Sequence, residues 1–96
     1  MAIRLIVTIT AAAGKGAELA EAYKARCAEV IREPGCEQFE LFQSVINPDK
    51  LAILERWTDA GSLDAHARIQ NARPPVRPEL RVGATEREDY LYNRTR

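Results

Sequence analysis

The chain has 96 residues, 46% of them hydrophobic, and a formal net charge of zero. This length suits one globular domain over residues 1–96 with a core of its own. Basic residues are spread along the chain, which argues against nucleic-acid binding. No apolar run approaches the ~20 residues of a membrane span, and a strand pattern begins directly at Met1-Ala2-Ile3-Arg4. We therefore expect a cytoplasmic protein with no targeting segment.

The first half of the chain predicts a strand, a helix and a second strand. Residues 3–10 alternate between two faces, and apolar residues recur at helical spacing over residues 16–33 until Pro34-Gly35. Gly14-Lys15-Gly16 lies between them. The third glycine of a dinucleotide-binding motif is missing there, so we interpret the segment as a strand–helix turn. A second strand is expected over residues 36–46.

The second half predicts a hairpin, a helix and a last strand. Asn47-Pro48-Asp49-Lys50 has turn chemistry, so residues 36–46 should pair antiparallel with a strand over residues 51–57. A helix is expected over residues 59–72, with its N-cap at Thr58-Asp59 and Pro74-Pro75 after its end. Residues 73–79 are expected to form an extended linker or flap. The last strand falls within residues 80–92 and is clearest over residues 84–92.

The order β-α-β-β-α-β predicts the split βαβ arrangement, an α+β fold with a four-stranded antiparallel sheet and two helices on one face. Alternation leaves apolar side chains on the opposite face, namely Ile6, Phe42, Ile46 and Leu54. Such a face is too apolar to stand in water. We therefore expect a second subunit or a ligand to cover it.

Residues 51–67 hold the side chains of greatest chemical interest, because the only Trp and the only His come from this strand–helix unit. His66 lies on the apolar stripe of the predicted helix. It is either a hydrogen-bonded core histidine or an acid, base or donor at a pocket mouth. Trp57 is either a core residue or a flat platform for a substrate.

Glu55 alternates with Ile53 and Trp57 on a buried strand face, where a carboxylate is costly unless it is paired. The expected partner is a basic side chain such as Arg4 or Arg56, one from another subunit, or His66. The residue is thus either part of a structural ion pair or a tuned general base. One His and two cysteines without CxxC spacing do not make an ordinary zinc site, so no metal is expected and both thiols should be reduced.

Residues 3 to about 92 resemble the antibiotic biosynthesis monooxygenase (ABM) domain family. The resemblance lies in Glu33-Pro34-Gly35-Cys36 with Phe39 and Leu41, in Glu55-Arg56-Trp57-Thr58-Asp59, and in Leu63 and His66. It implies a ferredoxin-like fold that dimerises sheet to sheet as a dimeric α/β barrel, with a pocket in each subunit between sheet and helices. Family members include cofactor-free oxygenases that act on quinols or polyketide phenols, and proteins of no known activity.

Two departures limit what the resemblance implies. Family members often have a second histidine five residues after the first, and here that position is Asn71. Haem-degrading relatives have an asparagine on the first strand, where this chain offers Val7 and Thr8. Haem oxygenation is therefore not expected.

The resemblance implies a homodimeric, cofactor-independent monooxygenase that oxidises a small aromatic quinol or polycyclic phenol. His66 would act as base or donor to the substrate oxygen, Trp57 as a flat wall, and Glu55 as the group that orients or charges a neighbour. Other residues expected to line the pocket, each with a core role as its alternative, are Tyr23, Phe39 and Phe42. The alternative functions are a non-catalytic ligand-binding or stress-response barrel, or an accessory subunit of another enzyme.

Overall fold

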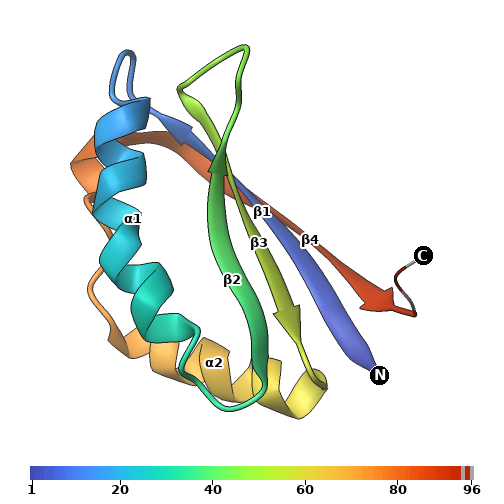
Figure 1. Ribbon diagram of the computed structural model, residues 1–96. Coiled ribbons are helices and arrows are strands. Elements are labelled where there is room, and N and C mark those ends of the chain that lie inside the picture. Colours follow the sequence, from blue (N-terminus) through green and yellow to red (C-terminus); the bar gives the residue numbers. More distant parts are fainter. Residues whose placement is uncertain (94, 96) are drawn as a thin grey trace.

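The computed structural model describes residues 1–93 and 95. The elements are β1 (Ala2–Ala11), α1 (Gly16–Val30), β2 (Cys36–Gln43), β3 (Lys50–Trp57), α2 (Ala60–Ala72) and β4 (Arg81–Tyr92), with a short 3-10 turn (Pro78–Leu80) before β4. The strands form an antiparallel sheet in the order β2-β3-β1-β4, and both helices lie on one of its faces (Figure 1). The ferredoxin-like α+β prediction is confirmed.

The core lies between the helices and the sheet face toward them, here called the inner face. The central strands β1 and β3 alternate between half-buried and buried residues from Arg4 and from Leu51 onward, as the sequence predicted. Leu5, Val7 and Ile9 of β1 face the helices, and Leu19 and Val30 of α1 are fully buried against them. Neither helix within the described residues is both long and apolar enough to cross a membrane.

Helix α1 ends at Val30, three residues before the predicted end. A residue that precedes proline is disfavoured in the α conformation, so Glu33 cannot continue the helix into Pro34. The backbone N–H of Glu33 instead bonds to the Val30 carbonyl at 2.9 Å. Gly35 then turns the chain with φ +80°, and a Cβ there would lie 2.1 Å from the Ser62 hydroxyl oxygen. The Glu33-Pro34-Gly35 stop therefore brings the end of α1 against the start of α2.

Helix α2 begins where predicted. Asp59 has extended backbone angles, and its side chain accepts a hydrogen bond from the Ser62 backbone N–H at 2.8 Å. This bond to the charged carboxylate holds the pKa of Asp59 below its ordinary value.

Strand β2 ends at Gln43, so the prediction that it reaches Ile46 was wrong. The Ser44 hydroxyl oxygen accepts hydrogen bonds from the backbone N–H groups of Ile46 and Asn47, at 3.3 and 3.1 Å. Such local bonds give the backbone an alternative to the strand ladder. Val45 and Ile46 consequently lie in the β2–β3 loop, 99% and 93% exposed, and belong to neither sheet face.

Strand β4 starts at Arg81, three residues before the part of the strand that the sequence predicted most clearly, residues 84–92. It contains a bulge. Thr8 of β1 pairs with Glu86, but Thr10 pairs with Val82, so β4 has two more residues than β1 between these pairs. Gly83, with φ +70°, lies in this bulge. Because the insertion is an even number of residues, the side chains before and after it keep the same facing.

The proline-rich segment before β4 is bound to α1 by two side-chain contacts. The guanidinium of Arg26 in α1 donates to the Pro74 carbonyl at 2.6 Å, and Arg77 pairs with Glu18 of α1 at 3.0 Å. Val76 packs against the core. The segment expected as an extended linker or flap is therefore held against α1 and the core.

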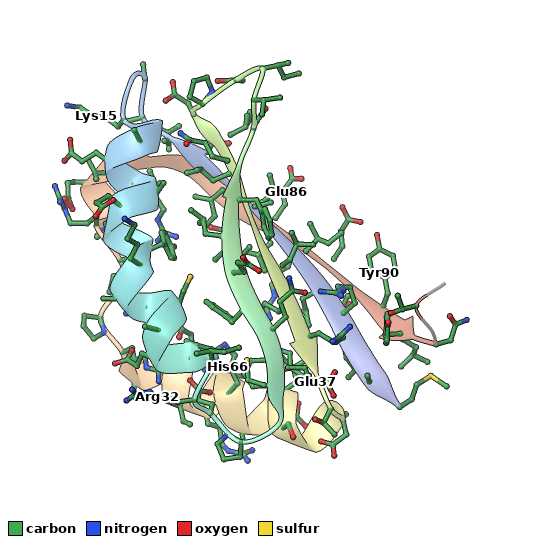
Figure 2. The ribbon with its side chains drawn as sticks, viewed as in Figure 1. Lys15, Arg32, Glu37, His66, Glu86 and Tyr90 are labelled. Carbon is green, nitrogen blue, oxygen red and sulfur yellow. The ribbon has the colours of Figure 1, made fainter. Side chains whose placement is uncertain are left out.

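The sheet face away from the helices, here called the outer face, has an apolar centre. Ile6 pairs with Leu54, and Phe42 pairs with Ala52 beside them; Phe42 is 45% exposed. Neither helix covers this face, and Figure 2 shows side chains such as Tyr90 on it. The outward direction predicted for Ile6, Phe42 and Leu54 is confirmed, and that of Ile46 was wrong.

Candidate functional site

The candidate site is a cavity of about 260 Å³ between the inner face and the helices. Every strand contributes to it, because the curved sheet and two helices enclose one space. Its lining residues are Val7, Ile9, Tyr23, Arg26, Phe39, Ile53, Glu55, His66, Gln70, Arg81, Thr85 and Arg87. A larger open groove of about 520 Å³ between α1 and β2 shares only Tyr23 with the predicted site. We therefore place the chemistry in the smaller cavity.

His66 enters the cavity from α2, in the space between that helix and the sheet (Figure 2). It is 5% exposed, and its ring centroid lies 4.6 Å from that of Trp57 and 5.8 Å from that of Phe39. The aromatic neighbours fix the plane of the imidazole ring. His66 is therefore both a buried histidine and a cavity residue, which joins the two interpretations that the sequence left open.

Glu33 holds the other side of the His66 ring. Its Oε1 lies 2.9 Å from His66 Nδ1, and its Oε2 lies 2.7 Å from an Nη of Arg73. The second approach is a charge contact rather than an aligned hydrogen bond. Because an ionised carboxylate can only accept, Nδ1 must be the donor, and Nε2 remains as the basic nitrogen. This geometry prepares His66 to take a proton.

Glu55 is 4% exposed and accepts a hydrogen bond from the Trp57 indole N–H at 2.9 Å. Within the described residues Glu55 forms no ion pair with Arg4 or Arg56, two of the partners that the sequence suggested, although the charges of His66 and Arg87 act on it. Arg4 instead reaches Gln38 and the Glu55 backbone carbonyl, while Arg56 pairs with Glu37 at 2.8 Å. Burial raises the pKa of Glu55, and the indole hydrogen bond offsets only part of this effect. The result is a carboxyl group that binds protons more strongly than an ordinary glutamate.

The comparisons with known proteins agree with this architecture. Residues 2–73 match the family model described as "Antibiotic biosynthesis monooxygenase". This chain belongs to that family. No curated protein matches the sequence. Solved structures of similar length do match it.

A conserved protein from Methanosarcina mazei Go1 is 29% identical, with a TM-score of 0.80 over 97% of this chain and 94% of that chain. A protein from Shewanella oneidensis is 27% identical, with a TM-score of 0.77 over 93% and 88% of the two chains. A Deinococcus radiodurans protein, described as a candidate antibiotic biosynthesis monooxygenase, is 22% identical, with a TM-score of 0.78 over 99% and 95%. The last comparison supports the fold alone.

Four of the six residues predicted for the site line the cavity: Glu55, His66, Tyr23 and Phe39. Trp57 is fully buried behind His66 and is absent from the lining, so its position does not match the expected flat wall. It acts instead on Glu55 and His66. Phe42 lies on the outer face, away from the cavity, because the alternation of β2 turns it opposite to Phe39.

Sequence reasoning missed Glu33 and the arginines of the cavity. Glu33 was noticed only as part of the helix stop, and its contact with His66 joins residues 33 positions apart. No local spacing signals such a contact. The arginines on β4 were obscured by the bulge, although alternation counted from Arg87 toward Arg81 would have placed both on one face.

The sequence also raised two other kinds of site, one for a metal ion and one for a phosphate. Among the described residues there is no cluster of three or more His, Cys, Asp or Glu that could hold a metal ion. In the Gly14-Lys15-Gly16 turn, the backbone N–H groups of both glycines donate to the Asp49 carboxylate at 3.0 and 2.9 Å. The donors that would contact a phosphate are thus used by an internal anion.

Proposed function

We propose that this protein is a cofactor-independent monooxygenase that oxidises a small quinol or phenol with O2. The observation that carries the proposal is the Glu33–His66 pair, whose histidine lies in the wall of a cavity lined by both apolar and polar side chains. Membership of the antibiotic biosynthesis monooxygenase family supports it. Such chemistry needs a base, donors that hold the phenolate, and the exclusion of water.

The first step in this proposal is removal of the hydroxyl proton. His66 Nε2 takes the proton, and the Glu33 carboxylate stabilises the imidazolium through the Nδ1 hydrogen bond. Tyr23 has a hydroxyl group in the same cavity, donated to by Arg81 at 3.4 Å, that can hydrogen-bond to the substrate oxygen. Glu55 lies in the same cavity and contributes a second proton-accepting group.

Oxidation then needs only the substrate and O2. The phenolate transfers one electron to O2, and the phenoxyl radical and superoxide combine to form a carbon–oxygen bond. Protonation gives a hydroperoxide, which loses water. The product has one more oxygen and two fewer hydrogens than the substrate, and the second oxygen atom leaves as water. A phenol with a free ring position becomes a quinone, and a quinol becomes a hydroxyquinone.

The size of the cavity restricts the substrate. Its volume of about 260 Å³ falls just below the ~300–1,000 Å³ of pockets for drug-sized ligands. A molecule of one or two rings fits this space better than a larger polycycle. The apolar part of the lining, Val7, Ile9, Phe39 and Ile53, suits an aromatic ring.

We also propose that two copies associate through their outer faces. The apolar centre formed by Ile6, Leu54, Ala52 and Phe42 lacks any covering element within the described residues of this chain. Polar residues such as Arg4 and Glu86 surround it, which is the arrangement of an interface with an apolar core and a polar rim. Burying this patch against its copy removes it from water and leaves the cavities on the outside of the dimer.

The test is O2 consumption by metal-free protein with a panel of hydroquinones and phenols, combined with ¹⁸O2 labelling. We expect enzyme-dependent uptake with one labelled oxygen in the product, and a loss of about 10²–10⁴-fold in kcat for His66→Ala. Asp64→Ala, an exposed change on the same helix, serves as the matched control and should keep wild-type activity.

Three results would contradict the proposal. They are uptake no faster than autoxidation across the panel, formation of H2O2 without labelled product, or full activity in a folded His66→Ala variant. Ligand-induced thermal stabilisation without any uptake would favour the non-catalytic binding protein instead.

A further inference from the structure

We propose that the substrate of this cavity is an aromatic hydroxy acid, with its carboxylate bound by Arg81 and Arg87 of β4. The inference rests on the proposed function, because it names the substrate class of the same cavity. It goes beyond that function in assigning a binding site for an anion to residues of β4, an element that takes no part in the Glu33–His66 pair.

Both arginines face the cavity because of the sheet register. Arg87 pairs with Val7, and Arg81 pairs with Ala11, and these two β1 residues are buried on the inner face. The bulge between the pairs adds two residues to β4, so the alternation is preserved and both guanidinium groups face the same way. The bulge also places Thr85 on the cavity wall between them.

These two guanidinium groups have no acidic partner within the described part of the chain. Neither forms a salt bridge there, and Arg81 contacts only the Tyr23 hydroxyl group as a side-chain partner. Arg26, the third arginine of the cavity, is different, since it lies 3.5 Å from Glu29 and donates to the Pro74 carbonyl. The two β4 arginines are thus cations left available to a ligand.

The cavity has fewer negative than positive side chains. Glu55 is the only carboxylate among the lining residues, against three arginines; one of its oxygens accepts from the Trp57 indole N–H, and it feels the charge of Arg87 without forming a salt bridge with it. Glu33 is occupied by His66 and Arg73. The cavity therefore has an excess of positive charge on its β4 side, where a carboxylate is stabilised by a planar fork of N–H donors.

The separation of the two walls suits one ring. The β4 and β3 strands are two strand spacings apart, which is about 10 Å. The long arginine side chains extend into this space from β4. The His66 ring, which packs tilted against Trp57 at the end of β3, bounds the space on its other side. A benzene ring with a carboxylate near Arg81 and Arg87 then presents a hydroxyl group toward His66 Nε2, with its ring between Phe39 and Ile53.

The experiment is a binding measurement by calorimetry at pH 7 under nitrogen, where no oxidation occurs. The probes are 2,5-dihydroxybenzoate and its uncharged methyl ester, which share the ring and both hydroxyl groups. The wild-type protein should bind the acid about tenfold more tightly than the ester. Arg81→Gln and Arg87→Gln should each remove most of this preference and leave the affinity for the ester unchanged.

Arg68→Gln is the matched control, since it removes one positive charge from an exposed position of α2 outside the cavity. It should keep the tenfold preference. If either cavity variant fails to fold, the wild type still decides the matter, because salt should weaken binding of the acid and not of the ester.

Equal affinity for both probes, no measurable binding of the acid, or a preference that survives in both cavity variants would overturn the inference. The proposed oxygenation is judged separately in air. Uptake of O2 with the ester and no preference for the acid would refute only the anion site. A preference for the acid without any uptake would refute only the oxygenation.

Discussion

Replacing Glu33 by Gln tests whether this residue orients His66. The change keeps the shape of the side chain, but it removes a charge that is 8% exposed and contacts His66 Nδ1 at 2.9 Å and Arg73 at 2.7 Å. Arg73 keeps Glu29 at 3.2 Å, so the loss is smaller than for a fully isolated buried charge. We expect the free energy of unfolding to fall by about 2 kcal/mol, which lowers Tm by roughly 10 °C for a domain of this size.

The same change should lower kcat about 10–100-fold, which is typical when a histidine loses the carboxylate that orients it. A glutamine amide can accept from Nδ1–H, but it does not stabilise an imidazolium as a carboxylate does. KM should change little, since Glu33 is absent from the cavity lining. Thermal unfolding followed by circular dichroism, together with steady-state O2 uptake, measures both effects.

The matched control is Glu37→Gln, which removes a carboxylate from the start of β2 (Figure 2). Glu37 also pairs with an arginine, Arg56, at 2.8 Å, but its side chain is 38% exposed. Exposed ion pairs contribute at most about 1 kcal/mol to the free energy of unfolding. This variant should therefore lose little stability and keep the wild-type kcat. If Glu33→Gln behaved like Glu37→Gln in both assays, the orienting role of Glu33 would be refuted.

Two further predictions concern Glu55 and the outer face. Burial raises the pKa of Glu55, so its charged form lowers the stability of the fold once the pH rises above the pKa that Glu55 has in the unfolded chain. Glu55→Gln should therefore raise Tm at pH 8, and this gain should shrink as the pH falls toward 4.5. A constant or opposite difference in Tm between pH 5 and 8 would contradict this sign. Phe42→Lys should weaken the proposed dimer, whereas Ile69→Lys, at a similarly exposed position on α2, should not; analytical ultracentrifugation measures both, and a monomeric wild-type protein would refute the dimer.

The fold could be predicted because its signals are local and periodic. Alternation located the two central strands to within a residue, and the Asp59 cap located α2. The errors occurred where side chains compete with a repeating pattern. Ser44 captures backbone N–H groups that alternation assigned to β2, and Pro34 acts on the residue before it. Both effects follow known physical rules. Each acts at a single position, whereas a periodic pattern is read over a whole segment and does not detect it.

The site could be predicted only in part, because its contacts join distant segments. The strand–helix unit of residues 51–67 brought Glu55 and His66 to one cavity, as expected from their faces. The partner of each was not predictable from spacing. Glu55 is bonded by Trp57 on its own strand, and His66 by Glu33, which is separated from it by β2 and β3. A paired carboxylate was foreseen, but only the tertiary structure shows which donors reach it.

The burial of two carboxylates beside one histidine is unusual for a chain of this size. Folding must desolvate Glu33 and Glu55 within a core that is otherwise apolar. For Glu55 the indole hydrogen bond offsets only part of this penalty, as its raised pKa shows, while Glu33 lies against His66 and Arg73. A purely structural core would be more stable with apolar residues at these positions. Under the proposed function these charges serve the chemistry of the cavity, and a Glu55→Gln protein that is more stable but less active would support this role.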